Sequence, residues 1–252
     1  MIFYFTGTGN SLDISNRLAE CLDDRAVSIA DEIGGPCSYR LEEGETVGIV
    51  SPIYFYGLPT IVEDFIGRMS FDREPSMYLV LSFGTYPAQA LARAERLLSS
   101  KGFRLSARLC VRMPENYVML FDPPDEREAG RILSSAYAEI EEFASAMASG
   151  RPVDMVTDEN IWHRTVGALA RPIYVHGRRT GRFYADTRCT GCGTCARICP
   201  SRAIEMVDRI PTWTKDRCIR CNACLNRCPM GALQFGRGTK GRGRYVNPNV
   251  RL

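Results

Sequence analysis

The chain has 252 residues, 45% of them hydrophobic, which suits one or two globular domains and excludes a wholly disordered protein. Its net charge of +3 is divided unevenly: residues 1–159 carry 14 basic and 25 acidic residues, whereas residues 160–252 carry 18 and 4, and this asymmetry indicates two different units. With no apolar run of about 18 residues and no secretory signal pattern at the N-terminus, we expect a cytoplasmic protein without a membrane span.

Apolar runs alternate with amphipathic segments through the first 150 residues. Short apolar runs are typical of strands buried on both faces of a parallel sheet, and apolar residues repeating every three or four positions are typical of helices. This alternation predicts an α/β fold with a doubly wound parallel sheet of five strands. The expected strands are residues 1–5, 26–30, 46–51, 78–83 and 105–113, and the expected helices are residues 12–22, 60–69, 88–100 and 126–147.

A connector is expected after this first unit, because two Arg-Pro pairs interrupt the pattern there and only one helix is indicated, over residues 162–170. We expect Trp162, Ile173 and Tyr174 of this connector to pack between the two units. The predicted domains are residues 1–150, a connector at 151–182, a second domain at 183–236 and a basic tail rich in Gly and Arg at 237–252.

Eight of the eleven cysteines lie in two runs that repeat 29 residues apart. In a chain without a secretory signal, such crowding favours metal binding over disulfides. Structural zinc usually takes two CxxC pairs separated by a longer spacer, so zinc is the less favoured alternative here. The runs are Cys189-x2-Cys192-x2-Cys195-x3-Cys199-Pro200 and Cys218-x2-Cys221-x2-Cys224-x3-Cys228-Pro229.

This repeat closely resembles bacterial-type ferredoxins that carry two [4Fe–4S] clusters, and the resemblance covers residues 183–235. It implies a small α+β domain. In two-cluster ferredoxins the fourth cysteine of each run ligates the other cluster. The resemblance therefore implies one cluster on Cys189, Cys192, Cys195 and Cys228, and a second on Cys218, Cys221, Cys224 and Cys199.

The first loop, Thr6–Ser11, joins a strand to a helix and is rich in hydroxyl groups. Hydroxyls, backbone N–H groups and a helix N-terminus together favour an anion. No Gly-Lys-Ser/Thr follows, so this is not a P-loop. A dinucleotide-binding pattern fits only in part, with Asp31 as the ribose acid, and NAD remains an alternative. The candidate phosphate-binding residues are Thr6, Thr8, Gly9, Asn10 and Ser11.

Two later strand ends add aromatic residues that could cover a flat ring. Ligands of open α/β sheets bind beyond the carboxyl ends of the strands, which is where these residues lie. The alternative is a hydrophobic patch or a domain interface. The candidate residues are Ser51, Pro52, Ile53, Tyr54, Phe55, Tyr56 and Gly57 in one loop, and Ser82, Phe83, Gly84, Thr85 and Tyr86 in the next.

The hydroxyl-rich loop resembles the FMN-phosphate loop of flavodoxins, in which the two later loops flank the isoalloxazine ring. Most of the chain is similar to the flavodoxin-like and ferredoxin fusion proteins of anaerobic microbes, although typical flavodoxins are acidic and this chain has a basic second half. The resemblance implies a flavodoxin-like FMN domain followed by a two-[4Fe–4S] ferredoxin domain.

The implied function is an iron–sulfur flavoprotein that carries electrons between two [4Fe–4S] clusters and FMN. Redox partner proteins are implied as donor and acceptor, but the sequence does not name them. One alternative is a flavin-dependent reductase of a small organic substrate, fed by the clusters. The other is a redox-responsive protein whose basic half binds nucleic acid. No residue is assigned a catalytic role.

Overall fold

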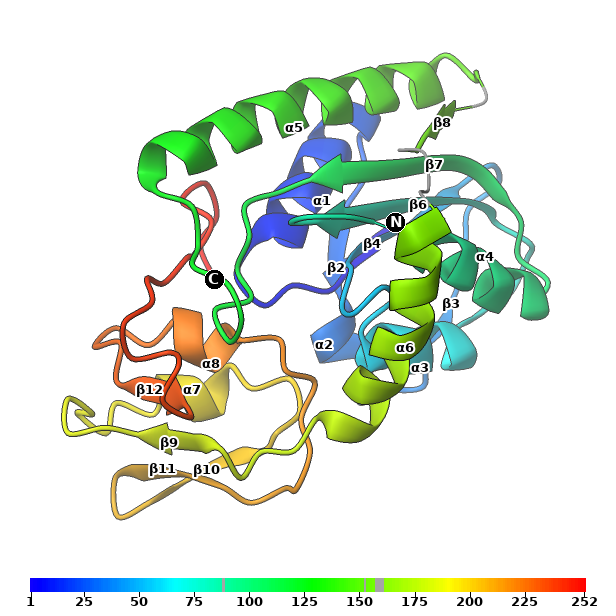
Figure 1. The fold of residues 1–252 in the computed structure, drawn as a ribbon. Coiled ribbons are helices and arrows are strands. Elements are labelled where there is room, and N and C mark those ends of the chain that lie inside the picture. Colours follow the sequence, from blue (N-terminus) through cyan, green and yellow to red (C-terminus); the bar gives the residue numbers. More distant parts are fainter. Residues whose placement is uncertain (88, 152, 157–160) are drawn as a thin grey trace.

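A computed structural model describes residues 1–87, 89–151, 153–156 and 161–252, without the side chains of residues 161–166, 168 and 169. The chain forms an α/β part built on one large sheet and a smaller part that lies beyond the carboxyl ends of its strands (Figure 1). Among the described residues, no helix is both long and apolar enough to cross a bilayer.

The large sheet has six described strands, all paired in parallel, in the order β2-β1-β4-β6-β7-β8. This confirms the predicted fold class, a doubly wound parallel sheet. Its strands are β1 (Ile2–Tyr4), β2 (Ala26–Ser28), β4 (Thr46–Pro52), β6 (Ser76–Phe83), β7 (Leu105–Arg112) and β8 (Val153–Met155). A two-stranded parallel ladder of β3 (Ser38–Tyr39) and β5 (Ser70–Phe71) lies apart from it.

The sixth strand, β8, was not predicted, because Val153–Met155 lies within the expected connector. Three residues are too few to show the alternation of side chains that is typical of a strand. The segment also follows Gly150, whose positive φ is typical of a turn. The strand is recognisable only from its parallel pairing with Ala107–Leu109 of β7.

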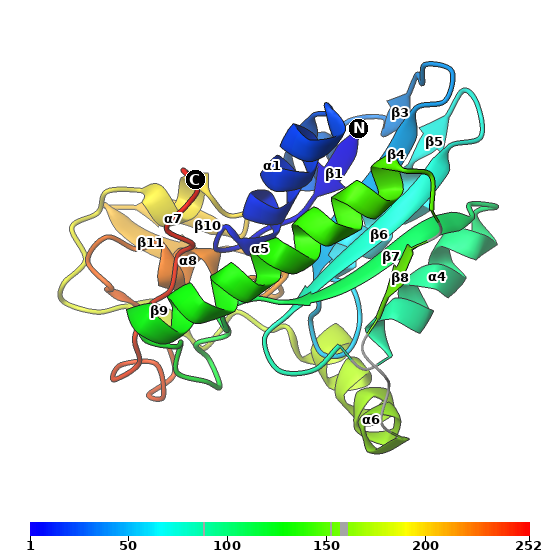
Figure 2. The ribbon, with the colours of Figure 1, turned by 90° about the horizontal axis from the view of Figure 1, so that it is seen from above.

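Helices cover both faces of the sheet, and alternate residues of β6 show why. Leu79 and Leu81 join the core on one face, while Tyr78 and Val80 join the core on the other. Helices α1 and α5 lie side by side on the second face (Figures 1 and 2). The helices of this part are α1 (Asn10–Leu22), α2 (Ile29–Glu32), α3 (Thr60–Arg68), α4 (Ala90–Ser100) and α5 (Glu126–Ala148); Ala88, the predicted start of α4, lies outside the described residues.

Helix α6 (Ile161–Gly177) leads from the α/β part to the smaller part (Figure 1). Tyr174 is 1% exposed, and its hydroxyl donates to the carbonyl oxygen of Ile219 at 3.0 Å, so it packs between the two parts. The same expectation for Ile173 is wrong: this residue is 65% exposed, because consecutive helical residues point about 100° apart. The side chain of Trp162 lies outside the described part.

The smaller part is built from a duplicated unit. Its two short helices begin 29 residues apart, at Thr194 and Ala223, and β10 and β12 begin with the same offset, at Ile204 and Leu233. One core of apolar side chains includes residues from both copies, such as Cys195 and Leu225. The elements are β9 (Phe183–Ala185), α7 (Thr194–Arg197), β10 (Ile204–Val207), β11 (Ile210–Trp213), α8 (Ala223–Asn226) and β12 (Leu233–Phe235); β9 pairs with β12 and β10 with β11, both antiparallel.

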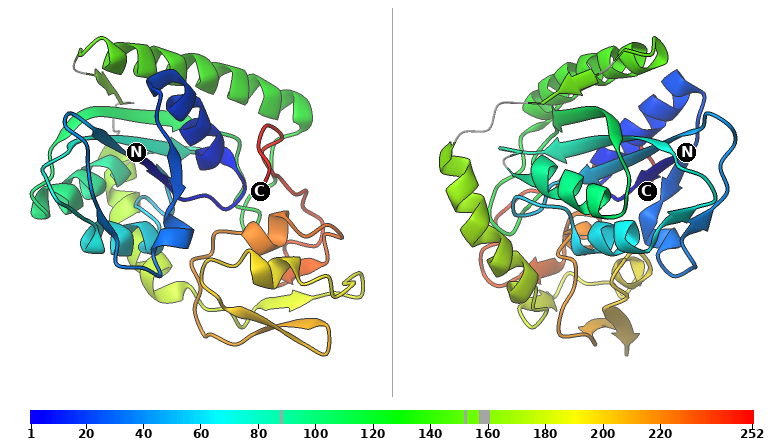
Figure 3. Two further views of the ribbon diagram at one scale, coloured as in Figure 1. Left: turned by 180° about the vertical axis from the view of Figure 1, so that it is seen from behind. Right: turned by 90° about the vertical axis from the view of Figure 1, so that its right-hand side faces the viewer.

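Residues 237–252 contain neither helix nor strand, yet Thr239, Tyr245 and Asn247 are buried. This segment runs back past the smaller part to the amino end of α1, where the C-terminal residues lie beside the first loop of the chain (Figure 3). It is therefore part of the packed structure and not a free tail.

Candidate functional site

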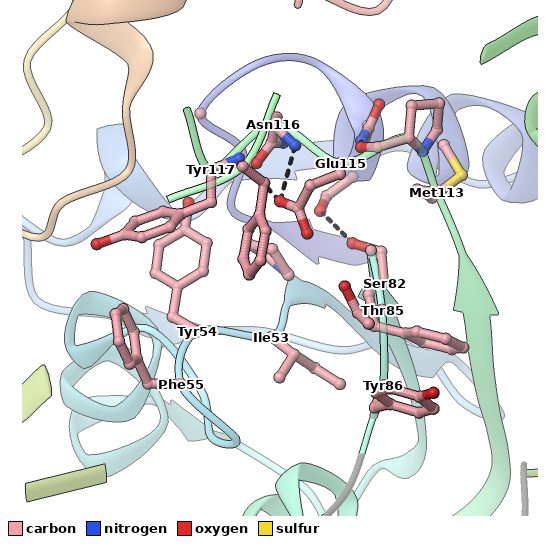
Figure 4. A pocket seen from close by; sticks show the side chains of 18 of the residues that line it. Ile53, Tyr54, Phe55, Ser82, Thr85, Tyr86, Met113, Glu115, Asn116 and Tyr117 are labelled. Carbon is pink, nitrogen blue, oxygen red and sulfur yellow. Dashed lines mark hydrogen bonds between the residues drawn. The ribbon is translucent and has the colours of Figure 1, made fainter. Parts of the chain in front are cut away.

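Four strand-end loops of the large sheet enclose a pocket of about 550 Å³. Figure 4 shows Tyr54, Phe55 and Tyr117 along one side of this pocket and Thr85 and Tyr86 along the other. The lining is mainly apolar and aromatic, as expected of a site for a flat organic group. The predicted residues that line it are Thr6, Asn10, Ser11, Pro52, Ile53, Tyr54, Phe55, Tyr56, Ser82, Phe83, Gly84, Thr85 and Tyr86.

Four of the predicted residues do not line the pocket: Thr8, Gly9, Ser51 and Gly57. The hydroxyl of Thr8 is fully buried and accepts a hydrogen bond from the Asn116 amide at 2.6 Å. Ser51 is also buried and donates to the carbonyl oxygen of the residue after it. Thr8 and Ser51 thus stabilise the loops on the side away from the pocket. A sequence pattern alone cannot distinguish such residues from neighbours that face the pocket.

The loop that follows β7 also lines the pocket, although it was not predicted to do so. The rule that selected the other strand ends applies equally to this one, but the loop has neither glycines nor several hydroxyls to attract attention. Its Glu115 is the one charged residue among the described lining residues, and its carboxylate accepts N–H bonds from Asn116 at 2.9 Å and Tyr117 at 2.8 Å. The missed lining residues are Gly7, Met113, Pro114, Glu115, Asn116, Tyr117, Leu120, Phe121 and Ala170.

The first loop is held in a fixed shape at the amino end of α1. The Thr6 hydroxyl accepts the backbone N–H of Gly9 at 2.9 Å, and Gly9 has the positive φ of 104° that glycine tolerates best. The Asn10 amide donates to the carbonyl oxygen of Pro114 at 3.0 Å. No side chain caps α1, so backbone N–H groups of its first turn remain for an anion in the pocket.

One set of four thiols, the outer cysteine group, surrounds a cavity of about 20 Å³ in the smaller part. It joins three cysteines of the first run to the last cysteine of the second, and its Cys192 is exposed to solvent. The thiols are spread around the cavity, and within the described residues no three ligand side chains converge on a single metal ion. The group consists of Cys189, Cys192, Cys195 and Cys228.

The remaining thiols, Cys199, Cys218, Cys221 and Cys224, form the inner cysteine group. The pKa of the Cys221 thiol is raised to about 12, mainly by burial and to a smaller extent by the nearby Cys218 and Cys199. Burial also raises the pKa of Cys224 well above its usual range, with the other three thiols of the group adding to the effect. Cys221 and Cys224 are therefore protonated at neutral pH without metal, and metal binding must release their protons.

Backbone N–H groups donate to sulfur in both groups, again in repeat-related positions. Ala203 donates to Cys199 at 3.4 Å and Ala232 donates to Cys228 at 3.3 Å. Such bonds are one of the ways in which a protein sets the potential of an iron–sulfur cluster.

The inner cysteine group lies directly against the pocket-forming loops. Ile219 and Cys221 pack into the core of the α/β part. A Cβ atom on Gly7 would lie 2.3 Å from the carbonyl oxygen of Cys221, so the two backbones are in close contact. Phe55, which lines the pocket, stacks on Tyr174 with ring centroids 5.4 Å apart and planes at 17°. The pocket and the inner cysteine group are therefore adjacent, with Gly7 in contact with both.

Comparison with known families agrees with this two-part arrangement. Residues 1–105 match the family described as a flavodoxin domain, and residues 187–233 match the 4Fe-4S dicluster domain. The chain is a flavodoxin–ferredoxin fusion. The fusion protein is accordingly an iron–sulfur flavoprotein with a redox role. No curated protein matches the chain.

Several solved structures are similar to part of the fusion protein. The FMN-dependent NADH-azoreductase from Bacillus anthracis, solved with FMN, is 14% identical, with a TM-score of 0.37 over 58% of this chain and 98% of its own. Megasphaera elsdenii flavodoxin is 13% identical, with a TM-score of 0.35 over 57% and 98%. A Bacteroides uniformis protein described as a putative flavoprotein is 15% identical, with a TM-score of 0.35 over 44% and 88%.

Opposite charge contributes little to the contact between the two parts of the fusion protein. Among the described ion pairs, one joins residues 1–159 to residues 160–252, between Arg171 and Glu63. The guanidinium of Arg178 donates hydrogen bonds to two neutral acceptors, the Thr60 hydroxyl at 3.0 Å and the carbonyl oxygen of Cys218 at 3.3 Å. Packing and hydrogen bonds therefore contribute most of the described contacts between the two parts.

Proposed function

We propose that the fusion protein carries electrons between two [4Fe–4S] clusters and FMN. The observation that carries this proposal is the close contact between the inner cysteine group and the pocket, through Gly7 and Cys221. When bound, the clusters pass electrons singly and FMN accepts them singly or in pairs. The chain's own residues hold the cofactors, exclude water between them and fix their spacing.

The pocket suits FMN in both shape and polarity. The uncapped amino end of α1 and the side chains of Thr6, Asn10 and Ser11 would hold the phosphate. The aromatic walls around Tyr54 and Tyr86 would cover the flat ring. Among the described lining residues there is one carboxylate and no basic side chain, which suits a single phosphate held by hydrogen bonds better than a dinucleotide with two.

The two cysteine groups suit two clusters with crossed ligation. Each group supplies four sulfur donors, and in each one donor comes from the other run. The exposed Cys192 belongs to the outer group, whereas the inner group packs against the flavodoxin part. We therefore infer a route from solvent through the outer cluster and the inner cluster to FMN.

A partner protein would dock around the loop of the outer group. The guanidinium of Arg197 donates to the carbonyl oxygen of Cys192 at 3.0 Å, and that of Arg209 donates to Thr190 at 3.2 Å. Met230 and Ile210, 47% and 60% exposed, lie close by. An apolar patch with basic neighbours fits a small acidic redox protein, such as a ferredoxin or a flavodoxin.

Removing the two arginines should slow reduction of the fusion protein by such an acidic donor. We expect Arg197→Ala/Arg209→Ala to lower the second-order rate by about tenfold at low salt and to flatten its salt dependence. Stopped-flow absorbance measures this rate, with reduction by dithionite as a check that both clusters are intact. Arg96→Ala, an exposed arginine on α4, is the matched control. An unchanged rate in the double variant would place the docking surface elsewhere.

The cofactor content tests the proposed function directly. Anaerobically purified protein should contain two [4Fe–4S] clusters and one FMN per chain, measured by iron, sulfide and flavin assays and by the visible spectrum. After rapid reduction of the clusters, flavin reduction should not depend on protein concentration, because the route is internal. Stoichiometric zinc, or a rate proportional to concentration, would contradict the proposal. Absence of flavin with salt-sensitive binding of nucleic acid would favour the nucleic-acid alternative.

A second candidate is reduction of a small organic substrate at the same flavin. The observation that favours it is the pocket mouth, where Tyr86, Leu120 and Phe121 are 53%, 57% and 48% exposed. Exposed apolar side chains at the rim of a pocket suit a flat, apolar molecule. Steady-state oxidation of reduced protein by small quinones or nitroaromatic compounds, compared with oxidation by a protein acceptor, distinguishes the two functions.

A further inference from the structure

The phosphate loop, Thr6–Ser11, is enclosed from behind by residues that come much later in the chain. Residues 244–250, here called the return segment, leave the ferredoxin part and reach the amino end of α1 (Figures 1 and 3). Gly9 is in such close contact with this segment that a Cβ atom there would lie 2.7 Å from Val250 and 2.9 Å from Asn247. None of the return segment lines the pocket.

Buried hydrogen bonds fix the return segment to the phosphate loop. The Asn247 backbone N–H donates to the carbonyl oxygen of Thr8 at 2.8 Å. The Asn247 amide donates to the carboxylate of Asp13 at 2.9 Å and to the side-chain oxygen of Asn10 at 3.3 Å. The Tyr245 hydroxyl donates to the same Asn10 oxygen at 2.9 Å. Because these side chains are 1–6% exposed, a loop that moved would leave polar groups buried without partners.

The other end of this network lies on the inner cysteine group. The side-chain oxygen of Asn226, in the same short helix as Cys224, accepts the Tyr245 backbone N–H at 3.1 Å. The Asn226 amide donates to the carbonyl oxygen of Asn116 at 3.1 Å, and the Asn116 amide donates to the Thr8 hydroxyl. Asn226 therefore links the inner cysteine group to the phosphate loop by two routes, one through Tyr245 and one through Asn116. In addition, Cys221 contacts Gly7 directly.

We propose that the return segment couples the inner cysteine group to the phosphate loop, so that iron binding at these cysteines raises the affinity of the pocket for FMN. Without metal, the four thiols are no longer bound to a common group, so they no longer hold the loop around Cys221 and helix α8 in place. The hydrogen-bond network that starts at Asn226 is then less firmly fixed at this end. Coupling between two binding sites is reciprocal, so bound FMN slows loss of the inner cluster to a chelator. Asn247 and Tyr245 act as positioning residues in this coupling. The inference rests on the proposed FMN site.

The first test compares FMN with riboflavin, which lacks the phosphate. Asn247→Ala should raise the dissociation constant for FMN by about tenfold, because two buried hydrogen bonds to Asp13 and Asn10 are lost. The dissociation constant for riboflavin should change little, since the phosphate loop does not contact it. A merely structural defect would weaken both ligands equally. Quenching of flavin fluorescence in the iron-loaded full chain measures both constants.

Two further variants complete this test. Asn249→Ala is the matched control, because this exposed asparagine, two residues along, bonds through its amide to the Tyr137 hydroxyl and not to the loop. It should leave both constants unchanged. Tyr245→Phe removes one hydroxyl and keeps the ring, so it provides the measurement even if Asn247→Ala does not fold. It should weaken FMN by a smaller factor and spare riboflavin.

The second test removes iron from the full chain with a chelator under anaerobic conditions. Wild-type protein should then bind FMN about tenfold more weakly, and the Asn247→Ala variant should lose little further, because its coupling is already broken. If FMN still binds more tightly than riboflavin by the wild-type factor, both after iron removal and in Asn247→Ala, this inference is overturned. The proposed FMN site would then still stand. Wild-type protein that binds riboflavin as tightly as FMN would instead overturn the proposed phosphate site.

Discussion

Replacing Cys199 with alanine is expected to remove the inner iron–sulfur cluster and to spare the outer one, although Cys199 belongs to the first run of cysteines. Its thiol lies with Cys218, Cys221 and Cys224, which are the thiols whose pKa it raises. With one cluster lost, iron and sulfide contents should fall by about half. Flavin reduction through the clusters should be lost as well, because the inner cysteine group adjoins the pocket.

The matching variant of the outer cysteine group, Cys228→Ala, provides the comparison with Cys199→Ala. Cys228→Ala should remove the outer cluster, leave the inner one next to FMN, and abolish reduction by a protein donor while sparing electron exchange between flavin and the inner cluster. Electron paramagnetic resonance and iron assays distinguish the two variants. Cys21→Ala, at an exposed cysteine on α1, is the control for loss of a thiol. Selective loss of the outer cluster in Cys199→Ala would show that each run holds its own cluster.

Alanine in place of Gly7 should destabilise the fusion protein and slow electron transfer to the flavin. The new methyl group would lie 2.3 Å from the carbonyl oxygen and 3.2 Å from the carbonyl carbon of Cys221, both backbone atoms that cannot rotate away. Overpacking of this kind costs about 1–3 kcal/mol. The phosphate loop and the inner cysteine loop must separate to admit the methyl group, and FMN affinity should fall with them.

Urea unfolding and stopped-flow flavin reduction measure these effects in Gly7→Ala. Gly130→Ala is the matched control, because Gly130 lies within helix α5 and a Cβ atom there meets nothing within 4 Å. This control should be stabilised by about 0.5–1 kcal/mol, since alanine favours a helix over glycine. Wild-type stability and wild-type rates in Gly7→Ala would mean that the two loops are not in contact in solution.

The parallel sheet and the metal-binding role of the cysteines could be predicted because the sequence patterns that indicate them are local. Strand β6 is buried on both faces, so its apolar residues follow one another without interruption. The spacing of the first three cysteines is also set within each run, because in ferredoxins of this kind one loop supplies three ligands to the same cluster. Even the pocket followed in large part from the rule that ligands of such sheets bind at the strand ends.

The parts that sequence reasoning missed depend on distant partners. Nothing in the sequence around Glu115 indicates that its carboxylate occupies the space beside Gly84. A Cβ atom added at Gly84 would lie 2.2 Å from this carboxylate. Likewise, Tyr245 and Asn247 lie in a segment whose Gly and Arg content indicates a loop, while their partners Asn10 and Asp13 are at the other end of the chain. Loop composition predicts the absence of helix and strand, but it does not predict what the loop contacts.

The return segment also implies an order in which this protein folds and acquires its cofactors. On the ribosome, the sheet strands β1 to β7 emerge first and both cysteine runs follow, while Tyr245 and Asn247 are translated after all of them. Domains generally fold as units in the order of synthesis, so the sheet forms while its phosphate loop still lacks support from behind. We therefore expect maturation to proceed from sheet to iron and only then to flavin, and newly made chains deprived of iron should accumulate as a folded sheet with little flavin.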